Sequence, residues 1–146
     1  MSEANNIISK QLIDIFENVI KMERVTINKE ANTELSMTEI HTIAATGREE
    51  LESMSVIAGK LHITVGTLTV AMNNLVKKGY VERYKSEKDR RIVKIGLTKQ
   101  GKEIYRIHEE FHHELGRILT KGMTEGEAVI VKRAIANLEE FIRQGC

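Results

Sequence analysis

Two histidines stand four positions apart in the sequence His-Glu-Glu-Phe-His, which runs from His108 to His112. On a helix, histidines at positions i and i+4 can bind one zinc ion, and the glutamate after the first histidine can act as a general base in hydrolysis. A zinc hydrolase also needs a third ligand and a substrate cleft. The segment before His108 has the pattern of a different kind of site, so we expect no enzyme and keep zinc hydrolysis as a remote alternative.

That preceding segment, residues 53–98, has the pattern of two short helices followed by a basic β-hairpin. Ser53 or Ser55 can begin the first helix and Thr64 the second, because a hydroxyl accepts hydrogen bonds from the free amides of a helix start. Gly79 is suited to end the second helix. This order of elements predicts a winged helix-turn-helix. The side chains expected to face the core are Val56, Ile57, Leu61, Val65, Leu68, Met72 and Leu75.

The opposite face of the second helix carries short hydroxyl and amide side chains and no long acidic ones. Side chains of this kind can approach the base edges and the phosphates of DNA. We therefore predict that this face contacts DNA. Its residues are Thr64, Gly66, Thr67, Thr69, Val70 and Asn73.

The hairpin tip has the sequence Lys-Ser-Glu-Lys-Asp-Arg-Arg between the β-rich segments 80–84 and 92–97. Arg90 and Arg91 at this tip can enter a minor groove or bind phosphates, where a guanidinium group is favoured over an ammonium group. Asp89 cannot contact phosphate favourably, so we expect it to orient an arginine through a charge-assisted hydrogen bond. The full set of expected DNA contacts is Thr64, Gly66, Thr67, Thr69, Asn73, Lys77, Lys88, Asp89, Arg90 and Arg91.

Charge is distributed unevenly along the chain, although the formal net charge is only +1. Eleven of the 22 lysines and arginines, but four of the 21 acidic residues, lie between Lys77 and Arg106. This window carries +7 and the remaining residues carry −6. A basic face on an acidic body favours DNA binding through that face. Taken alone, such a run is more often a solvated surface.

Two helices are expected before this unit. Residues 6–29 carry apolar side chains at spacings of three and four, which predicts a long helix with one apolar stripe and a second apolar flank. Ser36 and Glu39 match the capping box, in which two side chains satisfy the free amides of a helix start. The second helix is therefore expected to begin at Ser36, or at Thr38 a little later, and to end near Thr46, where Gly47 follows.

Two more helices are expected after the hairpin. Thr98 can begin one that ends before Gly122, and Thr124 with Glu127 again has the form of a capping box. The helices at the two ends of the chain carry more apolar surface than one small winged domain can cover, so we expect dimerisation through them. The expected organisation is a single, mainly α domain, 1–146, with dimerisation helices in 1–34 and 99–146 and a DNA-binding lobe in 35–98.

Composition is consistent with one helical domain. The chain has 146 residues, 41% of them hydrophobic, and no proline. No apolar stretch approaches the roughly 20 residues of a membrane span, and the single cysteine, Cys146, fits a reducing compartment. We therefore expect a soluble, cytoplasmic protein.

The hairpin and its flanks resemble the MarR family of winged-helix regulators. The most specific match is Asp89, Arg90 and Arg91, followed by β residues and then Leu97 and Thr98. The sequence Leu-Val-Lys-Lys-Gly-Tyr-Val-Glu-Arg, residues 75–83, is similar to the junction between helix and wing in that family. The resemblance covers essentially the whole chain. It implies a homodimer that binds palindromic double-stranded DNA, with the second short helix in the major groove and the two arginines in the minor groove.

Four segments are similar to one branch of this family, the repressors of bacterial fatty-acid synthesis genes: residues 39–43, 64–83, 86–91 and 108–112. This similarity implies long-chain acyl carrier protein as the co-repressor. An acyl chain would then lie among apolar side chains of the first, second and fifth helices, and the alternative is that these side chains are ordinary core. The candidate pocket residues are Met22, Ile40, Ile43, Ile107 and Phe111.

Zinc-sensing relatives in the family place metal ligands on their first, second and fifth helices. At similar places this chain has Glu23, His41, His108 and His112. Three imidazoles and one carboxylate would complete a tetrahedral zinc site. The alternative is a structural cluster, in which the glutamate and the histidines satisfy one another's hydrogen bonds.

Overall fold

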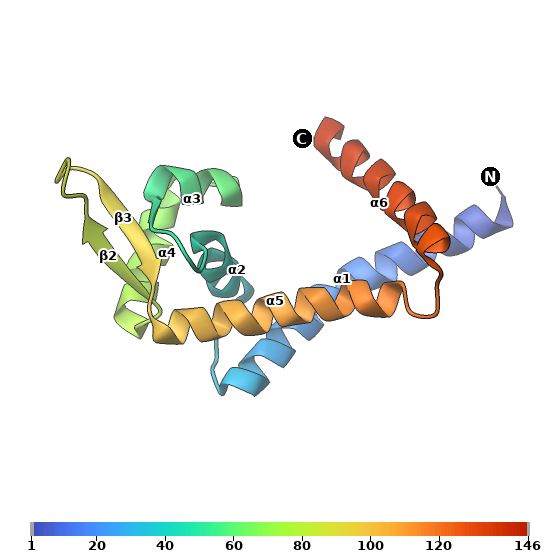
Figure 1. Cartoon of the computed structure of the whole chain (residues 1–146), viewed down its shortest axis with the longest axis horizontal. Helices are drawn as coiled ribbons and strands as arrows, with labels where there is room; N and C mark the ends of the chain where they lie inside the picture. Colours follow the sequence, from blue (N-terminus) through green and yellow to red (C-terminus); the bar gives the residue numbers. More distant parts are fainter. Residues whose placement is uncertain (1, 146) are drawn as a thin grey trace. The chain divides into compact units, whose positions relative to one another are not determined.

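Helices make up most of the chain, and a small sheet has two of its strands after the fourth helix. The computed structural model describes residues 2–145, so Cys146 lies outside the described residues. The elements shown in Figure 1 confirm the expected mainly α fold with a β wing. In chain order they are α1 (Glu3–Ala31), α2 (Met37–Thr46), β1 (Glu52–Ser53), α3 (Met54–Leu61), α4 (Val65–Lys78), β2 (Val81–Lys85), β3 (Val93–Leu97), α5 (Lys99–Leu119) and α6 (Glu125–Gly145).

Hydroxyl side chains begin the helices where the sequence predicts. The Ser36 hydroxyl accepts a hydrogen bond from the Glu39 amide at 3.2 Å, and the Glu39 carboxylate accepts one from the Ser36 amide at 3.1 Å. The predicted capping box of α2 is therefore confirmed. Ser53 and Thr64 cap α3 and α4 in the same way through their hydroxyls. Each such cap stabilises a helix by about 1 kcal/mol.

Residues in the left-handed conformation end α3 and α4. His62 has a φ of 55° at the turn between the two helices, and Gly79 has a φ of 84° directly after α4. Glycine is favoured at such a position because it has no Cβ to clash with the backbone. Within residues 2–145 no single helix is long and apolar enough to cross a membrane, and α3 with α4 reaches that length only across a bend of 104°.

The N-terminus of α5 approaches the junction of α4 and β2 very closely. The Thr98 hydroxyl donates to the Gly79 carbonyl at 2.6 Å and accepts from the Gly101 amide at 3.2 Å, so Thr98 caps α5 as predicted. A Cβ added at Gly101 would lie 2.1 Å from the carbonyl oxygen of Tyr80. Only glycine allows this approach, which joins the wing to the long helix.

The sheet has three antiparallel strands in the order β1-β3-β2. The predicted hairpin is confirmed, with Val81 opposite Leu97 and Arg83 opposite Ile95. The sequence did not predict β1, whose Glu52 lies opposite Ile95 on the other edge of β3. Ser53, which caps α3, therefore belongs to the same sheet as the hairpin of the wing.

Helix α4 packs on the hydrophobic core through one face. Leu68, Met72 and Leu75 are fully buried, as expected, and so is Ile57 of α3. Leu61 is half-buried and packs against this cluster. The prediction was wrong for Val56 and Val65, each 45% exposed. Both lie in the first turn of a helix. Each step of one residue along a helix rotates the side-chain direction by about 100°, and near a helix end fewer neighbouring elements cover a side chain.

The chain divides into two compact units, residues 1–111 and 112–146, and the division falls within α5. The first unit contains the hydrophobic core. In the second, the Thr124 hydroxyl accepts from the Glu127 amide at 3.2 Å and so begins α6, as predicted. No described residue of α6 is buried, and Ile130 and Phe141 are 62% and 75% exposed. In the first unit, α1 also has exposed apolar side chains, namely Ile7, Ile8, Ile13, Ile15, Phe16, Ile20, Met22 and Val25.

Candidate nucleic-acid interface

Helix α4 presents one polar face away from the core. The six residues predicted for this face are all exposed: Thr64, Gly66, Thr67, Thr69, Val70 and Asn73. Val70 is 73% exposed and is the most exposed apolar side chain of the helix. A Cβ added at Gly66 would meet only the Thr64 hydroxyl, at 3.9 Å, so the fold itself does not require glycine there.

Threonine hydroxyls on this face are already engaged within the helix. The Thr64 hydroxyl donates to the Thr67 hydroxyl at 2.9 Å and accepts from the Thr67 amide at 3.1 Å. The Thr69 hydroxyl donates to the Val65 carbonyl at 2.8 Å. Since a hydroxyl has one hydrogen and two lone pairs, Thr69 offers a ligand its lone pairs and its methyl group. These bonds also fix the side-chain rotamers before a ligand arrives.

Asn73, on the same face, is held from the neighbouring strand. The Arg83 guanidinium of β2 donates a hydrogen bond to the Asn73 side-chain oxygen. Sequence reasoning gave Arg83 no role, because the contact joins a helix to a strand and no local pattern indicates it. Lys77, one turn further along α4, is exposed as expected.

The wing tip holds its basic side chains in solvent. Lys88, Arg90 and Arg91 are exposed, and the Arg91 side chain is 95% exposed. Asp89 accepts a hydrogen bond from the Arg91 backbone amide at 3.0 Å, while its carboxylate lies 3.9 Å from the Arg91 guanidinium. Asp89 was expected to orient an arginine side chain. In the structure its short contact is with the Arg91 backbone amide, so Asp89 mainly stabilises the turn.

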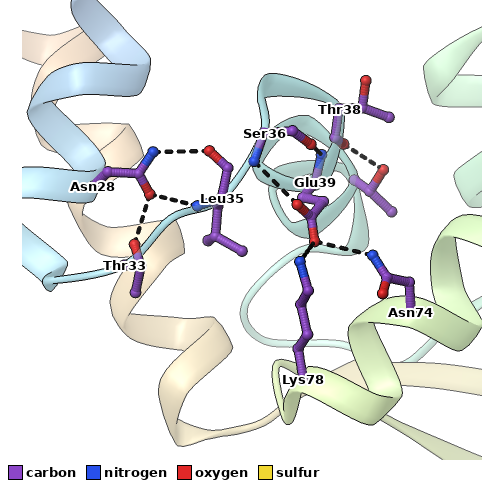
Figure 2. A network of polar contacts seen from close by, with 9 residues as sticks. Asn28, Thr33, Leu35, Ser36, Thr38, Glu39, Asn74 and Lys78 are labelled. Carbon is purple, nitrogen blue, oxygen red and sulfur yellow. Dashed lines mark hydrogen bonds and ion pairs between the residues drawn. The ribbon is translucent and has the colours of Figure 1, made fainter.

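Glu39 joins α2 to the C-terminal end of α4 (Figure 2). Its carboxylate accepts hydrogen bonds from the Lys78 ammonium at 2.6 Å and from the Asn74 amide at 3.2 Å. Burial alone raises the pKa of this carboxyl, but the hydrogen bonds from Lys78 and Ser36 and the positive charge of Lys78 outweigh burial. The pKa of Glu39 is therefore lowered, and the carboxylate stays ionised at neutral pH.

A second part of the same network ties α1 to the start of α2 (Figure 2). The Asn28 side-chain oxygen accepts from the Leu35 amide at 2.8 Å and from the Thr33 hydroxyl at 2.7 Å. Its amide nitrogen donates to the Leu35 carbonyl at 2.8 Å. One group of polar contacts thus ties α1 to the segment just before α2, and the other ties α2 to α4.

Three of the four candidate metal ligands lie together. The His108 Nε2 atom is 2.9 Å from one oxygen of Glu23, and the His41 Nε2 atom is 3.9 Å from the other. Glu23 is only 4% exposed, and one ligand atom from each residue lies within 4.8 Å of the others. Two imidazoles and a buried carboxylate are a donor set that suits zinc. His112 lies one turn beyond His108 on α5, at the start of the second unit.

The candidate acyl-pocket residues differ in their burial. Ile40, Ile43 and Ile107 belong to the hydrophobic core and are at most 1% exposed. Phe111 is 8% exposed, whereas Met22 is 61% exposed. Four of the five therefore lie in the protein interior, and Met22 lies at the surface of α1.

Comparison with known proteins places this geometry in a family. Residues 35–93 match the MarR family. The chain is 32% identical over 108 residues to the HTH-type transcriptional regulator SarZ of Staphylococcus saprophyticus, a match that covers 71% of this chain and 72% of SarZ. It is 24% identical to the uncharacterised HTH-type regulator YhjH of Bacillus subtilis, of which the match spans about half, 54%.

Among solved structures, the chain is similar to Streptococcus pneumoniae FabT in complex with DNA. The TM-score is 0.85 at 35% identity, and the match covers 97% of this chain and 99% of FabT. This family consists of transcriptional regulators, which confirms the expectation that the chain is not an enzyme. Fold, interface and relatives agree: the chain belongs to the MarR family of winged helix-turn-helix transcriptional regulators.

Proposed function

We propose that the protein is a sequence-specific DNA-binding repressor that acts on a palindromic operator. The observation that carries this proposal is the shared exposure of the polar face of α4 and of the basic wing tip. Helix α4 enters the major groove with Thr64, Gly66, Thr67, Thr69 and Asn73, and Lys77 binds phosphate. Arg90 and Arg91, with Lys88 and the turn residue Asp89, contact the minor groove and the backbone. As a regulator of transcription it acts in the cytoplasm.

The DNA-binding form is a homodimer. The exposed apolar residues of α1 and α6 supply the surface that a second copy covers. Two-fold symmetry then sets two recognition helices about 34 to 36 Å apart, which is the spacing of successive major grooves. A ligand that binds more tightly to one spacing of these helices shifts the protein toward that spacing. Operator affinity then changes by as much as the ligand's affinities for the two spacings differ.

The regulating ligand that we propose is long-chain acyl carrier protein, acting as co-repressor at fatty-acid biosynthesis genes. Similarity to FabT over nearly the whole chain supports this choice. The acyl chain lodges beside Met22 and among Ile40, Ile43, Ile107 and Phe111, and the acidic carrier protein meets basic residues nearby. Its binding favours the spacing that suits DNA.

A DNA-binding titration tests this function. The protein first selects its operator from a pool of randomised duplexes, and its affinity for the selected duplex is then measured alone, with unacylated carrier protein and with a long-chain acyl form. We expect enhancement by the acylated form alone. Equal affinity in all three conditions would exclude the co-repressor, and failure to select any sequence would exclude the DNA-binding function.

A zinc-responsive repressor is the second candidate, because Glu23, His41 and His108 converge as described above. These three residues would hold zinc, which as a bound cation would join the helices that carry them. Metal analysis of protein purified without chelator tests this candidate on the wild type and His108→Ala. His113→Ala, an exposed neighbour on α5, is the matched control. This candidate would be excluded if the wild type were purified without metal and if added zinc did not change its operator affinity.

A further inference from the structure

The contact between Arg83 and Asn73 determines which atoms the recognition helix offers to DNA. An arginine side chain has five N–H donors and no acceptor. The atom of Asn73 that faces Arg83 is therefore its carbonyl oxygen, as the structure shows. The Asn73 NH₂ group is then directed away from Arg83, and both residues are exposed.

The backbone that carries each partner of this contact is held by neighbouring elements. Arg83 lies opposite Ile95 in the β2–β3 ladder, and Ile95 is fully buried. Helix α4 is held one residue beyond Asn73 by the bond from Asn74 to Glu39. A side chain held by such surroundings presents its polar atoms in one orientation, which is a requirement for discrimination between bases.

The orientation of Asn73 favours one type of base. An asparagine that reads adenine uses its oxygen and its nitrogen together, on N6 and N7. Here Arg83 occupies one of the two lone pairs of the oxygen, and most of the groups that remain are donors: the Asn73 NH₂ and the other N–H groups of Arg83. In the major groove, guanine presents two acceptors, N7 and O6. A pair of donors therefore suits guanine better than adenine.

We propose that Arg83 is a specificity-determining residue, which positions Asn73 so that the pair reads one guanine in each operator half-site. This inference rests on the proposed DNA-binding function. An arginine that only neutralises a phosphate would raise affinity for all sequences equally. Positioning of Asn73 instead changes base preference at one position.

The test is selection from a pool of randomised duplexes by five proteins: wild type, Arg83→Ala, Arg83→Lys, Asn73→Ala and Lys85→Ala. Lys85→Ala removes a positive charge from the same strand, two residues from Arg83, and serves as the control. We expect the wild type and the control to select guanine at one position of each half-site. Asn73→Ala should become indifferent there, and Arg83→Ala should accept adenine, with guanine preference reduced on the order of tenfold. Arg83→Lys keeps the charge without the planar fork, so it should retain most affinity and lose most of the preference.

A modified base gives an independent readout. The base 7-deazaguanine lacks the N7 acceptor, and at the assigned position it should weaken wild-type binding on the order of tenfold while leaving Asn73→Ala unaffected. If Arg83→Ala weakened binding equally for every sequence and kept the guanine preference, Arg83 would be a phosphate contact and the inference would be wrong. The same holds if Asn73→Ala kept the wild-type preference. A wild type that selected no sequence would overturn the proposed function as well.

Discussion

The Glu39 carboxylate lies 2.6 Å from the Lys78 ammonium and connects the first turn of α2 to the last turn of α4. The same carboxylate completes the capping box with Ser36. One side chain therefore begins α2 and fixes the end of α4. Because Lys78 is 41% exposed, solvent screens part of the charge interaction.

Glu39→Gln is expected to lower the free energy of unfolding by about 1 kcal/mol at pH 7, since an amide still caps α2 but no longer carries the charge that attracts Lys78. The pKa of Glu39 is lowered in the folded state. Its contribution is therefore complete above the unfolded pKa of about 4.3 and is lost as pH falls through the folded pKa.

Urea unfolding of wild type and Glu39→Gln at several pH values checks this prediction. The difference between the two proteins should be constant near neutral pH and should vanish near pH 2, where both side chains are uncharged. Glu34→Gln, at an exposed position just before α2, is the control and should show little difference. A difference for Glu39→Gln that persisted at pH 2 would contradict the charge interaction.

Two glycines of α5 should respond oppositely to alanine. At Gly101 a Cβ would lie 2.1 Å from the Tyr80 carbonyl oxygen, whereas at Gly116 it would meet nothing within 4 Å. We expect Gly101→Ala to lower the free energy of unfolding by about 1–3 kcal/mol through steric strain. Gly116→Ala should instead raise it by about 0.5–1 kcal/mol, because alanine favours helix. Thermal unfolding of both variants measures the difference, and equal effects would show that the close approach is not rigid.

The wing arginines should control the salt dependence of DNA binding. Replacing both Arg90 and Arg91 by alanine removes charges that release counterions from DNA, so affinity should fall and the slope of log K against log salt should become shallower by about 1–2. Titrations of the selected operator at several salt concentrations measure this slope. Lys10→Ala, on α1 and outside the proposed DNA contacts, should leave it unchanged. An unchanged slope in the double variant would remove the wing from the interface.

Val70 should recognise a thymine methyl group, because its side chain is 73% exposed on the face of α4 that we assign to the major groove. Burying one methyl group contributes about 0.8 kcal/mol, or roughly a fourfold change in affinity. Deoxyuridine in place of one thymidine of the selected operator should therefore weaken wild-type binding about fourfold. Val70→Ala should be insensitive to that replacement, while Val70→Ile should remain sensitive. Equal sensitivity of wild type and Val70→Ala would contradict the contact.

Features set by local sequence could be predicted well. Ser36, Thr64 and Gly79 act through bonds to residues three or four positions away, so their helix boundaries follow from sequence alone. The same holds for the apolar spacing of Leu68, Met72 and Leu75, because helical period and burial agree there.

Features set by contacts between distant residues could not be predicted from these patterns. The two-residue strand β1 exists only because Glu52 and Ser53 pair with β3, some 40 residues later. Arg83 reaches Asn73 from another element, and no spacing rule links a strand to a helix face. Likewise, spacing within α5 indicated only His108 and His112. The grouping of His108 with Glu23 and His41, from two other helices, was expected from the family resemblance and not from spacing.

The pairing of β3 on both edges has a consequence for how this sequence can change. Residues 86–92 lie beyond the ladder that Lys85 and Val93 close, so insertions there would lengthen the wing tip without shifting any pair. One residue inserted between Val93 and Ile95 would instead turn the following side chains to the opposite face of the sheet. Ile95 would then leave the core, and its pairing with both Arg83 and Glu52 would be lost in a single step. Length variation among relatives should therefore be confined to the tip.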